Sequence, residues 1–386
     1  MVEYDPATFA LQQTVKVPTE AVKTPAAISV NRIGQILFAP TVSLPLSDED
    51  AKSAHKLWFW DGHAASTLDQ GVQRKVEARG SNQEVTESAP IAILSADGTH
   101  LFWFANESRR LQREGVDLSI TTTWQAWQTD TNGQNRQDVA SVNMPDCRCT
   151  TGSCEESCPT GVVWAPSALG KFFLMTQFVA GQTQTEYKST ALYRESSGKW
   201  TPTPLPEPLE RVMDASPDGT TIVEAIPDTG CCGWSNQSDD QTLVLADGKS
   251  RKIFDELESY KNPDYDLSFL TSNAALSPDL KSIAMTISAT ADGNHPIQLA
   301  EEGQANPEES QRIHKALSQL PAVEVKTVDV TPKRLAFLPH ASLIGWLNDK
   351  ELLIVEDRLL ATYNLTTGAR HKSSIKVDDP ARVFLR

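Results

Sequence analysis

An all-β fold, a single six-bladed β-propeller with one inserted helix, is predicted from three features of the sequence. The chain repeats a unit of four short apolar strands joined by polar turns. The turn from the first strand to the second carries Ser-Pro-Asp-Gly or a variant of it. First strands begin near residues 26, 90, 161, 211, 273 and 342. A closed ring of such blades leaves few exposed strand edges, so it suits a chain of 386 residues.

The fourth unit shows the pattern most clearly. Arg211 to Ala215 is its predicted first strand, and Ser216-Pro217-Asp218-Gly219 is the turn that follows. Proline presets the first corner of such a turn, and glycine accepts the positive φ that the turn requires. The second, third and fourth strands are predicted at Thr220–Ala225, Gln241–Ala246 and Lys249–Asp255.

The same frame divides the whole chain, residues 1–386, into blades of a single domain. The blades span about residues 26–69, 90–142, 161–203, 211–255, 273–337 and 342–377. Residues 9–17 alternate as a strand does, and we expect them to join the outside of the last blade and close the ring. The expected innermost strands are Ala26–Val30, Pro90–Leu94, Gly161–Ala165, Arg211–Ala215, Asn273–Leu276 and Ser342–Trp346.

Particular turns carry a resemblance to known propellers. Ser216–Gly219 has the full Ser-Pro-Asp-Gly turn, and Ser95–Gly98 and Ser277–Leu280 match it in part. Trp60-Asp61 falls at the end of a third strand, where a WD40 blade carries that dipeptide. The chain therefore resembles the TolB-like six-bladed propellers, and more loosely WD40 repeats. The resemblance implies an architecture and no particular ligand or activity.

One helix is expected within this β pattern, at Asn306 to Leu320. Asn306 suits an N-cap, and Pro307 suits the first helical position. Apolar residues follow at helical spacing, and Pro321 ends the run. We interpret this segment as an inserted helix that packs its apolar stripe on the propeller.

Composition and charge narrow the class of partner. The formal net charge of −15 opposes binding to phosphate backbones, so no nucleic-acid partner is expected. The sequence has no apolar run long enough for a membrane span. It has none of the common catalytic, phosphate-binding or dinucleotide-binding motifs. We therefore expect a monomer without a cofactor, a resident metal or an identifiable catalytic residue.

Six cysteines are the most specific local feature of the sequence, and they form two groups, four between residues 147 and 158 and two at residues 231 and 232. An even, clustered set is typical of disulfides in an oxidising compartment, so we expect a periplasmic or extracellular protein whose leader has been removed. The first four are expected to pair among themselves and the last two with each other, although bridges between the two groups are the alternative. Four thiolates could instead bind zinc, and the last two could form a redox pair. The cysteines are Cys147, Cys149, Cys154, Cys158, Cys231 and Cys232.

The long connections are predicted to gather on one face of the propeller. They are second-to-third-strand connections, at Thr41–His55, Asn106–Ile120, Gln177–Ser189, Ile226–Asp240 and Ala289–Val323. Long loops on one face of a rigid scaffold commonly carry a binding site, so the sequence favours a binding module for a protein, glycan or small ligand. The alternative is a propeller hydrolase or lyase with a metal in the central channel. The candidate ligand-binding residues are Cys231, Cys232, Trp234, Asp239, Asp240, His55 and His295.

Overall fold

The computed structural model describes most of the strands and the short turns between them. The described residues are 2–14, 25–30, 33–40, 56–69, 77–78, 83–87, 91–95, 97–113, 116–143, 147–150, 153–154, 161–166, 172–180, 185–197, 199–206, 208–209, 211–226, 241–246, 249–255, 267–291, 318–380 and 383.

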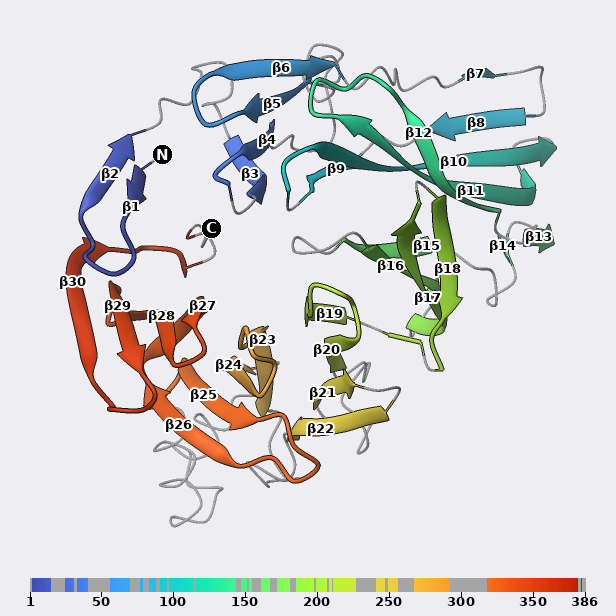
Figure 1. The fold of residues 1–386 in the computed structure, drawn as a ribbon. Coiled ribbons are helices and arrows are strands. Elements are labelled where there is room, and N and C mark those ends of the chain that lie inside the picture. The colour runs from blue at the N-terminus through green and yellow to red at the C-terminus, as the bar shows by residue number, and fades with distance from the viewer. Residues whose placement is uncertain are drawn as a thin grey trace. The chain divides into compact units, whose positions relative to one another are not determined.

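The chain divides into two compact units, and strands are the only regular elements among their described residues (Figure 1). The first unit is essentially Val15–Pro208, and the second is Val2–Thr14 together with Leu209–Leu385. Most of the expected helix, residues 306–317, lies outside the described residues. Its last three residues, 318–320, form a turn and an irregular segment.

The first unit contains three successive antiparallel sheets. The first has the order β3-β4-β5-β6, and the third has the order β15-β16-β17-β18. The second is an eight-stranded sheet in which β9, β10, β11 and β12 pair one after the other. The strands of the two four-stranded sheets are β3 (Pro25–Val30), β4 (Ile36–Pro40), β5 (Lys56–Trp60), β6 (Ala65–Asp69), β15 (Gly161–Pro166), β16 (Phe172–Ala180), β17 (Thr185–Ser196) and β18 (Lys199–Pro204). Those of the eight-stranded sheet are β7 (Glu77–Ala78), β8 (Gln83–Glu87), β9 (Ile91–Leu94), β10 (His100–Arg113), β11 (Val116–Asp130), β12 (Gln137–Asn143), β13 (Cys147–Thr150) and β14 (Ser153–Cys154).

The second unit contains three four-stranded antiparallel sheets and one short hairpin. Each sheet is a simple meander in which sequential strands pair. The hairpin is β1 (Val2–Tyr4) with β2 (Leu11–Thr14). The sheets are formed by β19 (Arg211–Ala215), β20 (Thr221–Ile226), β21 (Gln241–Ala246) and β22 (Lys249–Asp255); by β23 (Leu267–Leu276), β24 (Ser282–Ala291), β25 (Ala322–Thr327) and β26 (Arg334–Pro339); and by β27 (Ala341–Asn348), β28 (Glu351–Glu356), β29 (Leu359–Asn364) and β30 (Arg370–Lys376).

The hydrophobic core of each unit lies between the faces of neighbouring sheets, as it does between propeller blades. In the first unit, Leu37 and Leu57 of one sheet pack with Leu101 and Trp103 of the next. In the second unit, Val223 packs with Ile283 across the first pair of sheets. The cluster between the next two sheets contains Val323, Val325, Leu338, Leu343, Trp346 and Leu352. The apolar side chains of these strands are thus buried where neighbouring sheets face each other.

Polar side chains also join neighbouring sheets in the second unit. The Asp214 carboxylate accepts a hydrogen bond from the backbone N–H of Leu276, at 2.7 Å. The Asn273 amide donates to the Leu343 carbonyl at 3.1 Å, and the Trp346 indole donates to the Ala275 carbonyl at 2.9 Å. Each bond connects the first strand of one sheet to the first strand of the next, so the sheets are held in register along their inner edges.

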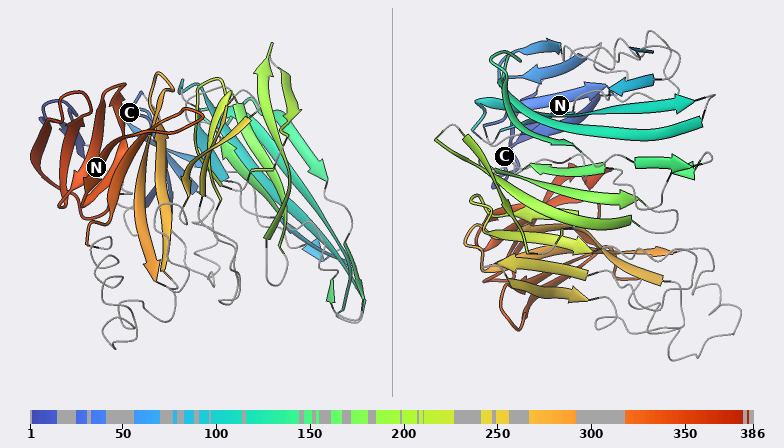
Figure 2. Two further views of the ribbon diagram at one scale, coloured as in Figure 1. Left: turned by 90° about the horizontal axis from the view of Figure 1, so that it is seen from below. Right: turned by 90° about the vertical axis from the view of Figure 1, so that its right-hand side faces the viewer.

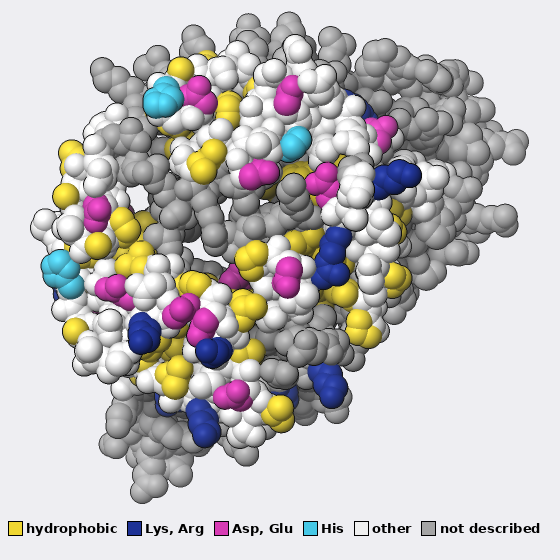
Figure 3. All heavy atoms as spheres, in the orientation of Figure 1, with side chains coloured by type: hydrophobic (Ala, Val, Ile, Leu, Met, Phe, Trp, Pro, Cys, Tyr) yellow, Lys and Arg dark blue, Asp and Glu magenta, His cyan; other side chains and the backbone are white. Residues whose placement is uncertain are grey.

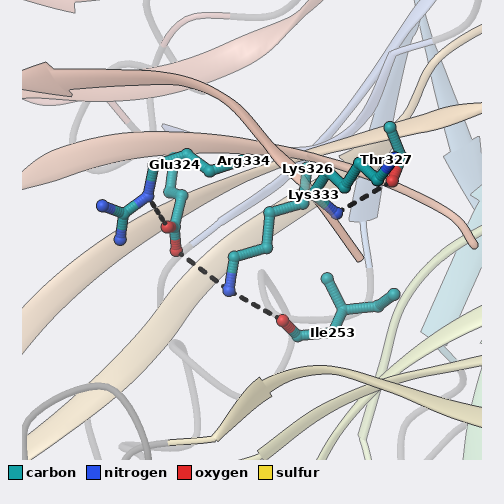
Figure 4. A network of polar contacts seen from close by, with 6 residues as sticks. All are labelled: Ile253, Glu324, Lys326, Thr327, Lys333 and Arg334. Carbon is teal, nitrogen blue, oxygen red and sulfur yellow. Dashed lines mark hydrogen bonds and ion pairs between the residues drawn. The ribbon is translucent and has the colours of Figure 1, made fainter. Parts of the chain in front are cut away.

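A second link joins β22, the last strand of the first sheet of this unit, to β25, the third strand of the next sheet (Figure 4). Lys326 on β25 donates to the Ile253 carbonyl on β22 at 2.8 Å. Its ammonium also lies 3.4 Å from a carboxylate oxygen of Glu324, whose other oxygen binds Arg334 of β26. Glu324 is buried, so the two cations balance a charge that has lost its contact with water.

The structure departs from the expectation of six equal four-stranded units. Five sheets have four strands, but the second predicted blade belongs to the eight-stranded sheet. The reason is that β10 and β11 continue well past the segment in which they pair with β9 and β12. Most of residues Asn106–Ile120, which the sequence predicts to be a loop, form the continuation of these two strands. Extra strands then pair with the exposed edges of the continuation. The predicted loop Gln177–Ser189 is likewise shorter, because its two ends belong to β16 and β17.

The N-terminal segment forms its own hairpin. Strand β2 pairs with β1, so the part of residues 9–17 that is described adds no strand to the sheet formed by β27–β30. Phe9 nevertheless packs with the hydrophobic cluster of that sheet, which includes Leu353 and Leu360. Its ring lies 5.3 Å from the His371 ring on β30. Residues 15–17 lie outside the described part of the chain.

Candidate binding face

The two ends of each sheet differ in construction. In an antiparallel meander, the connections from the first strand to the second and from the third to the fourth lie at one end, which we call the turn end. The second-to-third connection and the links to neighbouring sheets lie at the other, which we call the loop end. The described connections at the turn ends are short, as between Leu276 and Ser282 or Asn364 and Arg370.

Three turn ends share one hydrogen-bonded turn. In each, a serine hydroxyl donates to the aspartate two residues later, at 2.7 Å, in the pairs Ser95–Asp97, Ser216–Asp218 and Ser277–Asp279. The same serine oxygen accepts the backbone N–H five residues on. The residue after the aspartate has positive φ, and it is glycine in two turns and Leu280 in the third. The partial matches in sequence therefore fold as the full match does.

These hydrogen bonds lower the pKa of all three carboxyl groups. A hydrogen bond from the Ser216 hydroxyl, followed by bonds from Thr220, lowers the pKa of Asp218 to about 2. Burial acts to raise the pKa of Asp97, but bonds from Ser95 and Thr99 outweigh it and lower that pKa. The pKa of Asp279 is lowered against the same opposing effect of burial by Ser277 and Lys281.

We predict that Asp218→Ala lowers the free energy of unfolding in a pH-dependent way. A carboxyl whose folded pKa is depressed stabilises the fold above its unfolded pKa, near 3.8, and loses that effect as the pH falls toward 2. Because Asp218 is exposed, solvent screening reduces the expected loss to about 1 kcal/mol at pH 7. Urea titrations of the two proteins should differ at pH 7 and converge between about pH 4 and pH 2. A difference that stays constant over this range would contradict the proposed role of the charge.

Charges at the surface are mixed in sign. On the side of the molecule seen in Figure 3, Lys and Arg side chains and Asp and Glu side chains occur among one another within each unit. Among the described residues, no three His, Cys, Asp or Glu side chains lie together as a metal-binding group. The same part of the chain also contains no helix with the length and apolar character of a membrane span.

Among the described residues, the long hairpin formed by β10 and β11 extends one loop end of the first unit (Figure 2). Strands β10 and β11 remain register-paired from His100–Asp130 to Arg113–Val116. The pairing of β10 with β9 ends at Phe104, and the pairing of β11 with β12 ends at Thr123. We call the remainder, residues 107–113 and 116–122, the hairpin extension.

Two additional segments widen the hairpin extension into a sheet. Strand β8 pairs with β10 on one edge, with Val85 opposite Arg109 and Glu84 opposite Arg110. Strand β13 pairs with β11 on the other edge, with Cys147 opposite Ile120. Both segments belong to links between sheets, so the links and the hairpin form one structure at this loop end. A paired backbone gives such a surface a defined shape before any ligand binds.

Three of the six cysteines lie on β13, which pairs with the hairpin extension, and on β14, which pairs with β13. Cys147 and Cys149 lie on β13, and Cys154 lies on β14, where it is the Cα partner of Cys149. Sequence reasoning assigned this cluster to the loop face but did not predict the strands that carry it. The other predicted site residues lie outside the described part of the chain: Cys158, Cys231, Cys232, Trp234, Asp239, Asp240, His55 and His295.

The sheet formed by β27–β30 has a different loop end. Its second-to-third connection is the two-residue turn Asp357-Arg358, and both residues have positive φ. Buried Glu356 pairs with Arg370 and, at 3.0 Å, with Lys372. Lys372 also donates to Asp357, which lowers the pKa of that carboxyl and raises the pKa of the lysine. Sequence reasoning missed this charged group because its members come from two segments, the end of β28 and the start of β30.

Comparisons with known proteins add little to these observations. No protein-family model matches the chain, and no curated protein matches it. Solved structures that align with it include dipeptidyl peptidase 4 of Porphyromonas gingivalis, with 8% identity, a TM-score of 0.38, and coverage of 90% of this chain and 46% of that one. The GH74 xyloglucanase of Xanthomonas campestris has 10% identity, a TM-score of 0.26, and coverage of 91% and 48%. The polysaccharide lyase Uly1 has 10% identity, a TM-score of 0.30, and coverage of 70% and 74%.

The chain thus spans about half the length of the first two of these proteins. Because all three TM-scores are low, these likenesses carry no argument about activity. What the chain's own sheets support is an all-β, propeller-like series of antiparallel meanders.

Proposed function

We propose that this chain is an exported β-propeller binding module that engages a protein, glycan or small ligand through its loop ends. The observation that carries the proposal is the hairpin extension with β8 and β13 paired along its edges. The hydrophobic core around Trp103 and Trp127 requires only the parts of β10 and β11 that pair with β9 and β12. The additional paired backbone therefore contributes a shaped surface at a loop end, where recognition commonly occurs.

The proposal includes six blades in one closed, TolB-like ring. Support comes from β9–β12, which pair consecutively as the strands of the other five meanders do. It comes also from the shared Ser-Asp turns of three sheets and from the hydrophobic clusters between successive sheets within each unit. An inserted helix at 306–320 and the disulfides among the cysteines belong to the same proposal.

A trimmed hairpin tests the proposed binding role. Glu107 and Thr123 are Cα partners, so Ser108–Thr122 can be replaced by an Asn-Gly turn without changing the register of the remaining strands. We expect this variant to stay folded, because the contacts of β9, β10, β11 and β12 around Trp103 and Trp127 are kept. Its binding to the hits of a glycan array, a protein array and a small-ligand panel should fall at least tenfold.

Asp218→Ala is the matched control, since it alters a turn end and leaves the hairpin intact. It should lower stability and leave the affinity of the folded protein unchanged. If the trimmed variant binds as the parent does, the hairpin extension is not the binding surface. If the parent cleaves glycans or peptides instead of only binding them, the hydrolase or lyase alternative replaces the proposed module.

A further inference from the structure

We infer that Cys149 and Cys154 are joined by a disulfide that closes the β13–β14 hairpin. The inference rests on the proposed export of the protein, because the bond persists only in an oxidising compartment. The observation that carries it is the backbone register, in which Cys149 lies directly opposite Cys154 and Thr150 lies opposite Ser153. Sequence spacing alone left the pairing within the first cysteine group open.

The distances between register positions single out this pair. Directly opposite residues of antiparallel strands have Cα atoms about 4.5 or 5.5 Å apart, depending on the hydrogen-bonding pattern. Both values fall within the range of about 4.4–6.8 Å that a disulfide spans. The Cα separation typical of a register pair such as Cys149–Cys154 is therefore one that a disulfide can span.

The two other pairings among the cysteines of these strands fit less well. Cys147 and Cys149 are two residues apart on one strand, and a rise of about 3.3 Å per residue places them near the upper limit of the range. Cys147 and Cys154 occupy a diagonal position, where the separation of about 7–8 Å exceeds it. Cys147 is thus left for Cys158 or for the Cys231-Cys232 segment.

The Cys149–Cys154 disulfide forms by thiol–disulfide exchange with an oxidised partner protein. The Cys149 and Cys154 thiols lose two protons and two electrons, and a sulfur–sulfur bond forms between them. A protein disulfide of a thiol–disulfide oxidoreductase accepts both electrons and leaves as a dithiol. The bond fixes the β13–β14 hairpin, which is attached through β13 to the hairpin extension.

Mapping of the unreduced full chain tests the pairing, because the sequence offers cleavage sites between the cysteines. The chain is expressed through an oxidising compartment, alkylated, and digested without reduction. Trypsin cuts after Arg148, between Cys147 and Cys149, and a glutamate-specific protease cuts after Glu156, between Cys154 and Cys158. The expected product is peptide 149–156, two hydrogens lighter than its dithiol form and joined to no other peptide.

The other outcomes separate this inference from the proposed function. If peptide 149–156 is joined to peptide 137–148 or to peptide 157–171, the pairing is wrong while export stands. If all six cysteines are alkylated before reduction, or if elemental analysis finds one zinc per chain, both the pairing and the evidence for export are lost.

Serine variants give a second readout, the number of free thiols that are alkylated in denaturant. Cys149→Ser should expose one additional thiol to alkylation in denaturant, and so should Cys154→Ser. The double variant should expose none, because its two changes remove both partners of one bond. Cys147→Ser with Cys149→Ser is the matched control and should expose two. A double variant Cys149→Ser, Cys154→Ser that exposes two thiols would rule the bond out.

Discussion

Glu324→Ala should lower the free energy of unfolding by about 3 kcal/mol, as expected when one partner of a buried ion pair is removed. Glu324 is 1% exposed, and its carboxylate is shared by Arg334 and Lys326. Arg334 is 58% exposed and can regain water when the carboxylate is lost. Lys326 is only 14% exposed, so its ammonium would keep the Ile253 carbonyl as a partner but lose its countercharge. Chemical denaturation monitored by tryptophan fluorescence measures the loss.

Two further variants test whether the loss of stability comes from the buried charge of Glu324 rather than from substitution as such. Lys281→Ala breaks the exposed Lys281–Asp279 pair and should cost less than about 0.5 kcal/mol. Lys326→Ala combined with Glu324→Ala removes both buried charges, so the double variant should lose less than the sum of the two single losses. An additive double variant would show that Glu324 and Lys326 do not stabilise the fold as a pair.

The local β pattern could be predicted from the sequence where turn chemistry and alternation agree. Arg211–Ala215, Gln241–Ala246 and Lys249–Asp255 are strands with the predicted bounds. The Ser277–Leu280 turn was recognised although it lacks glycine, because the serine and aspartate that bond to each other were present. Such features are encoded within a few residues, so sequence reasoning captures them.

Features that depend on pairing between distant segments could not be predicted. Residues Asn106–Ile120 are rich in polar and charged side chains, which is why we interpreted them as a loop. Most of them pair with one another as a hairpin, and β8 and β13, from either side along the chain, pair with its edges. The Glu324 network has the same property, since Ile253 is far from β25 in sequence. No local pattern shows that Glu324 is buried, although its partners Lys326 and Arg334 lie on the same strand and on the next one.

Phe173→Ala should cost about 3–5 kcal/mol and test whether the chain unfolds as the single domain that we predicted. Phe173 is 1% exposed and stacks on Tyr193 with ring centroids 4.6 Å apart. It also meets Phe104 of the neighbouring sheet, at 6.0 Å, so its loss opens a cavity between two sheets of the first unit. Ile33→Ala, at a side chain that is 56% exposed, is the control and should change stability by less than about 0.5 kcal/mol.

Calorimetry then compares Phe173→Ala in the first unit with Glu324→Ala in the second. In a single cooperative domain, every part unfolds in the same transition, so both variants should lower the midpoint of one shared heat-absorption peak. Two compact units that unfold independently would instead give two peaks, and each variant would move only the peak of its own unit. In the proposed ring of six blades the hydrophobic cores would be continuous from blade to blade, and one shared transition is therefore the result that we expect.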